Sequence, residues 1–475
     1  MEEKKKRKLS RVQAGILFLL MMVILGGGSG FFGFELKMMV LIVVVILLLV
    51  GKYVGLTMGE MIDAYALKIR NMAPIFLILL GIGYLISGFM MGGTIPGLVS
   101  WLTNLISPSM ILLLSFVLVS ILSAMIGSSF ASIGTLGIIM FSVAIVQGVP
   151  VGLAGAAVIC GANFGGIISP FNDNMNATPA LYGMSSFEMI RKLILPVGIA
   201  TVISVIYYAV KGLPYAGEGG SLQREAITTL VNSVEELFNV NPIVILPLVL
   251  ALVLAVLKID IIINLYVSGT VGMFLGVFLQ GFSFKNCINS LYSGFSSDTF
   301  FAGKELPDSM RTLLNRGGMY SMADPICFLL IMFFMVSLLN QVGVFTVIQE
   351  MVFSNIKNPG LLTLVSTLSC WILMLVTLDG MPTGVVSKDM LENVYIRSGY
   401  DPRKVARIAC ASANWLGNWL PWAFCANYYA SVCGIEIWEC LPYMIFLPLP
   451  SIIIVILSFF GIGNEKLLEA KTAGN

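Results

Sequence analysis

The sequence predicts an all-α polytopic membrane protein built from two inverted-topology repeats. Of the 475 residues, 58% are hydrophobic and only 11% are charged, and the mean hydropathy is +0.95. A soluble domain could not keep so much apolar surface out of water. Apolar segments long enough to cross a bilayer occur in two series of seven, with one polar stretch between the series.

The two series of apolar segments share an internal order. Each has two hydrophobic spans, a polar amphipathic loop, a long span, and then shorter pieces interrupted by Gly and Pro. This correspondence predicts an internal repeat. The first series lies near residues 14–33, 36–51, 73–97, 108–127, 131–147, 150–169 and 193–212, and the second near 241–257, 261–283, 319–347, 360–378, 381–396, 405–424 and 441–461.

The polar stretch, residues 213–239, carries four glutamates against one arginine and is expected to be an acidic extracellular linker. The predicted domains are a basic cytoplasmic tail (1–12), a first repeat (13–212), this linker, a second repeat (240–463) and a cytoplasmic C-terminal tail (464–475). Within the repeats, scaffold spans are expected over 13–97 and 240–347. A hairpin followed by a broken helix is expected over 106–185 and again over 360–430.

Lysine and arginine set the expected orientation, because cytoplasmic loops carry an excess of both. Placing the basic clusters in the cytoplasm gives seven crossings per half, and an odd number inverts the second half. The basic loop 284–317 then lies outside, against the charge rule, so we expect an amphipathic helix on the membrane surface there. The cytoplasmic clusters are Lys52, Lys68 and Arg70, then Arg191 and Lys192, then Arg397, Arg403, Lys404 and Arg407.

Two segments have the pattern of re-entrant hairpins. The first, 106–138, turns at Gly127-Ser128-Ser129 and continues through Thr135. The second, 361–390, turns over 378–384, which contains Asp379 and Thr383. Irregular backbone at membrane depth is tolerated only where it lines a cavity or is buried in protein. The two hairpins therefore predict a shared central site.

Residues 169–179 (SPFNDNMNATP) form a polar knot after an apolar run with no charge from Val151 to Ile168. A carboxylate at that depth costs on the order of 3 kcal/mol unless partners or an ion solvate it. The prolines break the helix and free backbone carbonyls as ligands. Asp173 is thus the leading candidate for cation ligand and proton acceptor, although it could instead cap a half-helix. The neutral oxygens expected around it belong to Ser169, Asn172, Asn174 and Asn176, and Asp173 with Asn176 are the Na⁺ ligand candidates.

The second half has a matching knot in residues 412–427 (SANWLGNWLPWAFCAN). Neutral oxygens are expected from Asn414, Asn418 and Asn427, and Pro421 breaks the helix. The tryptophans, Trp422 among them, could form an interfacial belt or line a pocket for an organic substrate.

The sequence does not assign a single role to two further acidic residues, Asp379 and Asp324. Asp379 could serve the central site or lie in an ordinary solvated turn, since charged residues follow closely. Asp324 precedes Pro325 at the start of a long span and is expected at the membrane face. The chain has no histidine and no CxxC pair, so proton coupling is expected to use carboxylates, and no zinc or redox site is expected.

At these residues the chain resembles the NhaC-type sodium/proton antiporter family of the ion transporter superfamily, over nearly its whole length. The resemblance rests on Ser169-Pro170-x-x-Asp173-x-x-Asn176, on Arg316-Gly317-Gly318-Met319 and on Pro421-Trp422-x-x-Cys425. The Ser128–Gly137 hairpin is similar to a degenerate form of the family's Ser/Thr/Gly-rich hairpin. The resemblance implies inverted repeats, hairpins that meet mid-membrane, and elevator-like movement in a homodimer.

Members of the family usually have a Ser-Asp-Thr-Thr core, where this chain has Asn172-Asp173-Asn174-Met175, and many have an acid and a lysine where this chain has Gly166 and Ile167. The resemblance implies Na⁺/H⁺ antiport in which Asp173 alternately binds cation and proton, in a bacterial inner (plasma) membrane. The alternative is a Na⁺- or H⁺-coupled carrier of a small organic solute, an amino acid or a carboxylate such as malate or lactate.

Other classes fit less well. No cofactor beyond Na⁺ or H⁺ as coupling ions is expected, and with a net charge of +2 no nucleic-acid partner. An enzyme is not expected: an intramembrane protease would need HExxH, which is impossible without histidine, or a Gly-x before Asp379-Gly380, which the sequence lacks. A channel is disfavoured by the paired discontinuous segments, which suit alternating access.

Overall fold

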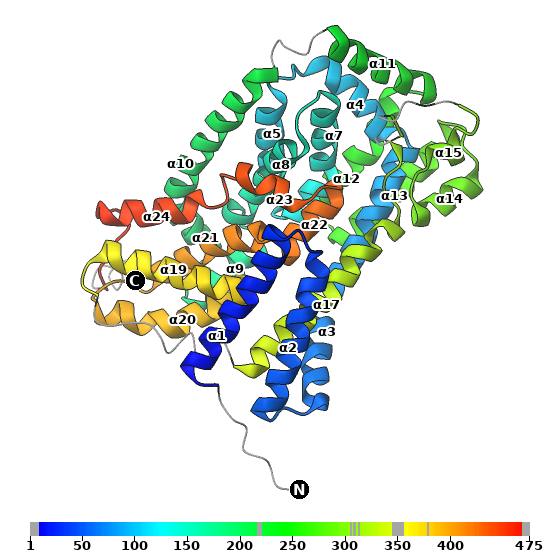
Figure 1. Ribbon diagram of the computed structural model, residues 1–475. Coiled ribbons are helices and arrows are strands. Elements are labelled where there is room, and N and C mark those ends of the chain that lie inside the picture. The colour runs from blue at the N-terminus through cyan, green and yellow to red at the C-terminus, as the bar shows by residue number, and fades with distance from the viewer. Residues whose placement is uncertain are drawn as a thin grey trace.

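The computed structural model describes residues 9–215, 221–304, 306, 310–311, 314–343, 356–377 and 380–467, and within these ranges the chain is nearly all helical (Figure 1). The one β-type pairing found there is an isolated bridge between Tyr400 and Lys466. Eight helices in the described ranges are long and apolar enough to cross a membrane: 12–29, 36–54, 72–91, 129–146, 151–168, 186–215, 261–278 and 319–342. The protein is therefore a multi-pass membrane protein.

One group of helices is formed by long spans that pack side by side. It consists of α2 (Leu36–Val54), α3 (Met58–Met91), α13 (Ile261–Phe278) and α17 (Ala323–Val342). With 34 residues, α3 is roughly 50 Å long at 1.5 Å per residue, which exceeds a bilayer core of about 30 Å. Its apolar part begins at Met72, and its first turns carry charged residues that extend beyond the core.

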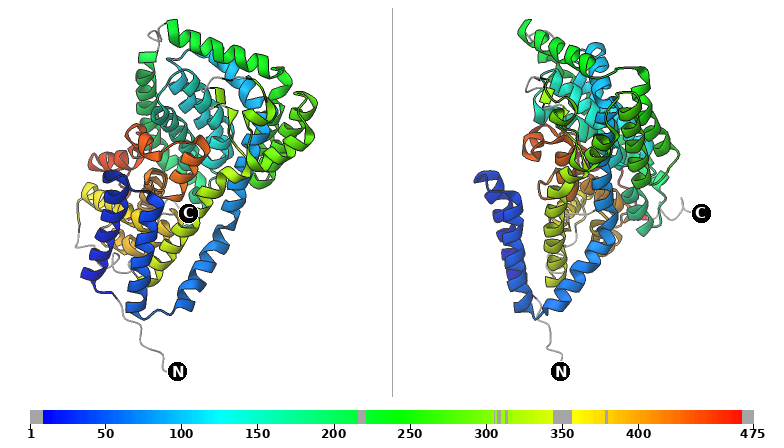
Figure 2. Two further views of the ribbon diagram at one scale, coloured as in Figure 1. Left: turned by 45° about the vertical axis from the view of Figure 1, so that its right-hand side comes forward. Right: turned by 90° about the vertical axis from the view of Figure 1, so that its right-hand side faces the viewer.

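The outer edge of this group is the pair formed by α1 (Arg11–Met22, continued as a π-helix over Val23–Phe31) and α2 (Figure 2). The first two spans are only 28% and 33% buried, against 61% for the apolar part of α3. Their exposed faces are apolar, as expected for contact with lipid. Lys37 of α2 pairs with Asp324 at the first turn of α17 at 2.5 Å. The Asp324 side chain is 70% exposed, so this acid lies at the surface as expected.

Glycines bring α3 and α13 into backbone contact. A Cβ built on Gly272 would lie 2.5 Å from the carbonyl oxygen of Gly88, and one on Gly88 would lie 2.2 Å from that of Gly269. Small residues at a helix crossing allow this close approach. The loop before α17 also approaches α3 closely at glycines. Gly318 has a φ of 84°, and its amide donates to the Gly83 carbonyl at 2.7 Å.

The second group contains two hairpins and two interrupted helices. The first hairpin joins α5 (Ile111–Ile126) to α6 (Ser129–Ser132), a π-turn (Ile133–Gly137) and α7 (Ile138–Val146). The second joins α19 (Pro359–Thr377) to α20 (Gly380–Arg397). The interrupted helices are α8 (Val151–Ile168) with α9 (Asp173–Leu181), and α21 (Arg403–Trp419) with α22 (Phe424–Cys433). The helices α10 (Ser186–Gly212), α23 (Ile437–Cys440) and α24 (Leu449–Phe459) pack around them.

Shorter helices cover the end of the molecule opposite the N-terminus (Figure 1). They are α4 (Thr94–Leu105), α11 (Ser221–Leu237), α14 (Phe284–Ser293) and α15 (Ser297–Phe300). The end of α11, Val231–Leu237, and the following helical segment, Pro242–Val256, meet at an angle of 98°, and this segment contains α12 (Leu246–Val256). Phe238 after α11 packs edge-on against Phe282 and Phe301, so the predicted linker and the basic loop 284–317 lie together.

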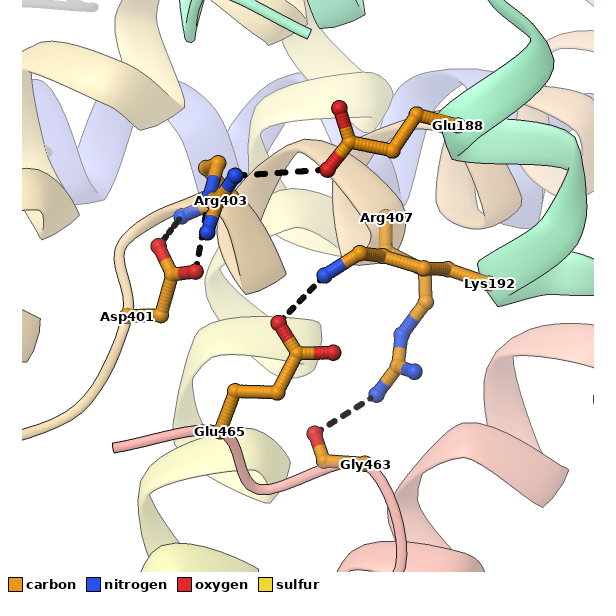
Figure 3. Close-up of polar contacts among 7 residues, drawn as sticks. All are labelled: Glu188, Lys192, Asp401, Arg403, Arg407, Gly463 and Glu465. Carbon is orange, nitrogen blue, oxygen red and sulfur yellow. Dashed lines mark hydrogen bonds and ion pairs between the residues drawn. The ribbon is translucent and has the colours of Figure 1, made fainter. Parts of the chain in front are cut away.

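A C-terminal segment, residues 463–467, fastens several helices of the second group (Figure 3). The Asp401 amide donates to the Glu465 carbonyl at 3.0 Å, and the Lys192 ammonium of α10 pairs with the Glu465 carboxylate. Arg403 bridges Asp401 at 2.7 Å and Glu188 of α10 at 3.3 Å. The segment thus ties α10 to the start of α21.

Lys404 is the most deeply buried lysine of this cluster, at 9% exposed. Its ammonium donates to the Ser458 hydroxyl at 2.7 Å and to the Asn464 side-chain oxygen. This first turn of α21 lies outside the eight candidate spans. Burial, with a smaller contribution from the Arg407 charge, lowers the pKa of Lys404 to about 7, although Glu465 opposes the shift.

Substitution of Gly272 by alanine should destabilise the protein by about 1–3 kcal/mol, because the new methyl group meets backbone rather than a movable side chain. The matched control is Gly198→Ala on the exposed face of α10, where nothing lies within 4 Å and alanine should be neutral or slightly stabilising. Thermal unfolding in detergent measures both. An equal or higher melting temperature for Gly272→Ala would contradict the backbone contact.

The stability of the protein should rise with pH between about 7 and 10.5 through Lys404. The unfolded chain binds a proton there that the folded chain does not, so the slope contributed is at most about 1.4 kcal/mol per pH unit. Lys404→Gln should remove this contribution while keeping a hydrogen-bond donor. The test compares melting temperatures at pH 6.5, 8 and 9.5. Parallel pH profiles for the two proteins would show that Lys404 keeps an ordinary pKa.

Candidate functional site

The first helix break is the four-residue segment between α8 and α9. Asn172 caps α9: its side-chain oxygen accepts from the amides of Asn174 at 3.0 Å and Met175 at 3.4 Å. Its side-chain nitrogen donates to the Gly127 carbonyl at 3.1 Å. Gly127 (φ 79°) is the turn of the first hairpin, so Asn172 fastens this hairpin to the break. Asparagine is strongly favoured as the N-cap residue of a helix, which explains why α9 begins directly after Asn172.

Asp173 is the first residue of α9, and its side chain lies outside the described part of the structure. Its backbone position places it at the N-terminal end of a helix, where the aligned peptide dipoles favour negative charge. Ser169, 1% exposed, closes the other side of the break by accepting from the Phe171 amide at 3.4 Å.

Asn176 holds the break from the next turn of α9. Its side-chain nitrogen donates to the carbonyls of Pro170 and Asn172, both at 3.0 Å, and its side-chain oxygen accepts from the Ser186 hydroxyl. The Pro170 carbonyl lies in the unwound turn, whereas the Asn172 carbonyl also accepts the Asn176 amide at 3.1 Å, which is the first bond of α9. The side chain of Asn176 therefore satisfies backbone groups, and its oxygen is already engaged by Ser186.

The second helix break, between α21 and α22, uses the same bonds. The side-chain nitrogen of Asn427 donates to the carbonyls of Pro421 and, at 3.0 Å, Ala423. In both breaks the asparagine lies six residues after the proline, and the two asparagines are 251 positions apart, at 176 and 427. Trp422, in the same break, is 6% exposed, so it faces protein rather than an interfacial belt.

A buried network connects both interrupted helices with the first hairpin. The Tyr429 hydroxyl of α22 lies 2.8 Å from the Asn418 side-chain oxygen and 3.2 Å from that of Asn163 in α8. The Ser129 hydroxyl donates to the same Asn163 oxygen at 3.4 Å. Asn418 in turn donates to the Asn414 carbonyl at 2.7 Å.

The sequence analysis missed Asn163 and Tyr429. Asn163 is the one strongly polar side chain between Val151 and Ile168, and its position corresponds to Asn414 by the same 251-residue separation. This 251-residue correspondence with Asn414 is the sequence signal that points to Asn163. The position of Tyr429 relative to Asn163 depends on how α22 folds back, and no local pattern encodes it.

Asn414 lies where the elements meet. A Cβ on Gly166 of α8 would be 2.9 Å from the Asn414 side-chain oxygen, 3.4 Å from the Ser129 hydroxyl and 4.0 Å from the Asn172 side-chain nitrogen. The Asn414 side-chain nitrogen is buried and has no hydrogen-bond partner among the described residues, and the same is true of the indole nitrogens of Trp415 and Trp422. Buried donors are normally satisfied, so these are available to water or to a bound group with acceptor atoms.

The second hairpin reaches the site from the other side. A Cβ on Gly380 would lie 2.9 Å from the Asn174 side-chain nitrogen, and one on Gly384 would lie 2.8 Å from the Thr178 hydroxyl. The turn of α20 thus packs on α9. Thr383 is fully buried and donates to the Met374 sulfur at 3.0 Å, whereas Asp379 lies outside the described residues.

The remaining predicted hydroxyls serve the first hairpin itself. Ser128 caps α6 by accepting from the Ala131 amide at 3.3 Å, and Thr135 donates to the Ala131 carbonyl at 2.7 Å. The structure therefore brings Ser129, Asn172, Asn174 and Asn414 together and leaves Ser128 and Thr135 as hairpin supports. In the described residues no cluster of three or more His, Cys, Asp or Glu exists that could hold a metal ion. Among the described side chains, the polar groups of the site are amides and hydroxyls, and backbone carbonyls lie beside them.

Comparison with known proteins gives the family. The chain matches the Na⁺/H⁺ antiporter family over residues 161–462, which includes both helix breaks and the second hairpin. An uncharacterized Na⁺/H⁺ antiporter from Haemophilus influenzae is 29% identical over 86% of this chain and 87% of the relative. The Na⁺/H⁺ antiporter NhaC of Alkalihalophilus pseudofirmus is 25% identical over 86% and 85%.

A third relative carries a different cargo. The malate-2H⁺/Na⁺-lactate antiporter of Bacillus subtilis is 25% identical over 83% of each chain. The family match covers more than half of the chain, and its residues include the Pro421 break and the basic start of α21. The chain belongs to the Na⁺/H⁺ antiporter family and is of the NhaC type.

Proposed function

We propose that the protein is a secondary active transporter that exchanges Na⁺ for H⁺, with Asp173 binding the two ions in turn. The observation that carries this proposal is the break between α8 and α9, where Asp173 begins a helix after the four-residue segment that follows the uncharged apolar helix α8, within a chain of the Na⁺/H⁺ antiporter family. An acid at membrane depth has a functional role by default. Because one carboxylate serves both ions, cation and proton compete for it.

Neutral oxygens would complete the cation shell. The carbonyls of the break, the Asn174 side chain and the Ser129 hydroxyl lie on elements that meet there. Na⁺ prefers such oxygen ligands, as hard cations do. Asn176 contributes indirectly, because it fixes the carbonyls of Pro170 and Asn172.

The same proposal includes two inverted repeats. Support comes from a constant 251-residue register: α6 to α7 spans 129–146 and α20 spans 380–397, while α9 begins at 173 and α22 at 424. The paired bonds of Asn176 and Asn427 follow this register. An odd number of crossings per half would invert the second repeat and place both termini in the cytoplasm.

The mechanism proposed is elevator-like. The group formed by α2, α3, α13 and α17 would be the fixed scaffold, since glycines lock α3 to α13. The hairpins and interrupted helices would carry the site across the membrane as one body. A homodimer in a bacterial inner membrane is the assembly that this arrangement is proposed to adopt.

A second candidate is coupled transport of a small organic acid. The observation that favours it is the set of unpaired N–H donors at Asn414, Trp415 and Trp422. A bare cation cannot accept hydrogen bonds, whereas a carboxylate accepts several. The relative named for malate and lactate gives this candidate a precedent within the same family.

Purified protein in proteoliposomes tests the first candidate with a pH-gradient dye. Added Na⁺ should dissipate the gradient, and Asp173→Asn should abolish this because the amide neither carries the proton nor supplies the negative charge. Asp324→Asn is the matched control, since that acid is exposed and pairs with Lys37, and it should stay active. Full activity of Asp173→Ala would remove Asp173 from the mechanism.

Asn414→Asp discriminates between the two candidates because it replaces the unpaired donor by an acceptor of the same shape. For a carboxylate cargo the KM should rise about tenfold or more, from the lost charge-assisted bond and the added repulsion. For Na⁺/H⁺ exchange the KM for Na⁺ should fall or stay constant. The control is Asn241→Asp, an isosteric change at a distant helix cap. Solute uptake by wild type without Na⁺-driven proton flux would favour the second candidate.

A further inference from the structure

The turn between α12 and α13 contains an unusual lysine. Lys258 has a φ of 59° and is the one non-glycine residue with a positive φ among those that the structure describes. Lys258 follows the C-cap of α12. Its amide donates to the Ala255 carbonyl and the next amide donates to the Leu254 carbonyl, both at 3.0 Å, which is the bonding of a helix end with a left-handed residue. The next acid along the chain, Asp260, is committed as the cap of α13, where its side-chain oxygen accepts from the Ile262 amide at 2.8 Å.

This backbone conformation directs the side chain toward the first helix break. The Lys258 ammonium lies 3.9 Å from the centre of the Phe171 ring, which is close for a cation on an aromatic face. Phe171 stands in the break itself, between Pro170 and Asn172, and two residues before Asp173. A positive charge is thereby held on a residue of the break that the proposed function takes as the cation site.

The contact also joins the two groups of helices. Lys258 comes from the turn that leads into α13, which packs along α3, whereas Phe171 comes from the interrupted helix. The Phe171 backbone and Cβ lie against Gly127 of the first hairpin, where a Cβ would be 2.7 Å from that of Phe171. The hairpin therefore positions the backbone and Cβ of Phe171, and the half-exposed ring carries the ammonium on its face.

We propose that Lys258 is a specificity-determining residue of this site: its ammonium, placed by Phe171, opposes cation binding at the break and would attract an anionic cargo. The inference rests on the proposed function for the location of the site. Lys258 and Phe171 are both exposed, so the repulsion between the ammonium and a bound cation is moderated by water and by salt, and it acts on the binding step. A site with one carboxylate and many neutral oxygens would otherwise hold a cation tightly, and rapid exchange requires release.

A charge series at one position tests the inference. Lys258→Arg, Lys258→Gln and Lys258→Glu share the backbone conformation and change the charge from +1 to 0 to −1. The KM for Na⁺ in the proteoliposome assay should stay near the wild-type value for Arg and fall about threefold or more for Gln. It should fall further for Glu. Lys285→Gln on the exposed face of α14 is the control, because it removes an equal charge far from the break.

Two readouts separate this role from a structural one. The difference in KM between Lys258→Gln and wild type should shrink as choline chloride raises the ionic strength, because salt screens the charge. Phe171→Leu should lower the KM in the same direction, and it should add little to Lys258→Gln, because both remove the same placed charge.

The outcome is separable from that of the proposed function. If wild type carries a carboxylate and no Na⁺-driven proton flux, Na⁺/H⁺ exchange fails, and the KM for the carboxylate should rise from Arg to Gln to Glu. A KM that is independent of charge at position 258, for whichever cargo is carried, overturns the inference.

Discussion

The structure depends on one constraint, which is that backbone groups released inside an apolar environment must find partners. Two helices are interrupted at proline in the middle of the protein, and each interruption frees carbonyls. The side-chain nitrogens of Asn176 and Asn427 donate to carbonyls of the two breaks with the same pair of bonds. Without them, the carbonyls of Pro170 and Pro421 would lose these donors, at a cost of several kcal/mol for each that is left without a partner. The carbonyls of Asn172 and Ala423 would keep the first amide bonds of α9 and α22. With both asparagines, short unwound segments persist and present the polar ligands of the site.

Much of this arrangement could be predicted from the sequence. Hydropathy and composition identify the spans, and Gly/Pro interruptions locate both hairpins and both breaks within a few residues. These features are local, because proline, glycine and asparagine act on the backbone next to them. The resemblance through Ser169-Pro170 and Pro421-Trp422 indicated the family, and the comparison over residues 161–462 confirmed it.

The rest depended on contacts between distant segments. Tyr429 reaches Asn163 across 266 positions, and only the folded chain brings the two together. The residue type makes Asn176 a candidate metal ligand, but its side-chain oxygen accepts from the Ser186 hydroxyl, which a sequence pattern does not reveal. The left-handed backbone of Lys258 belongs to the C-terminal cap of α12, but the contact of its ammonium with Phe171 joins distant segments, which no local pattern encodes. A sequence motif rich in asparagine shows which polar atoms are present, but it does not show which of them already have hydrogen-bond partners.

The C-terminal segment has a practical consequence. Residues 463–467 run back against the turn before α21, pair with α10 and accept a hydrogen bond from Arg407 at the Gly463 carbonyl. The end of the described chain is thus anchored on the hairpin-bearing half rather than on the long spans. Under the proposed elevator movement, a fluorophore or spin label placed there would move with that half, and a second label on the charged first turns of α3 would be the stationary reference. The distance between the two labels would then report the proposed movement.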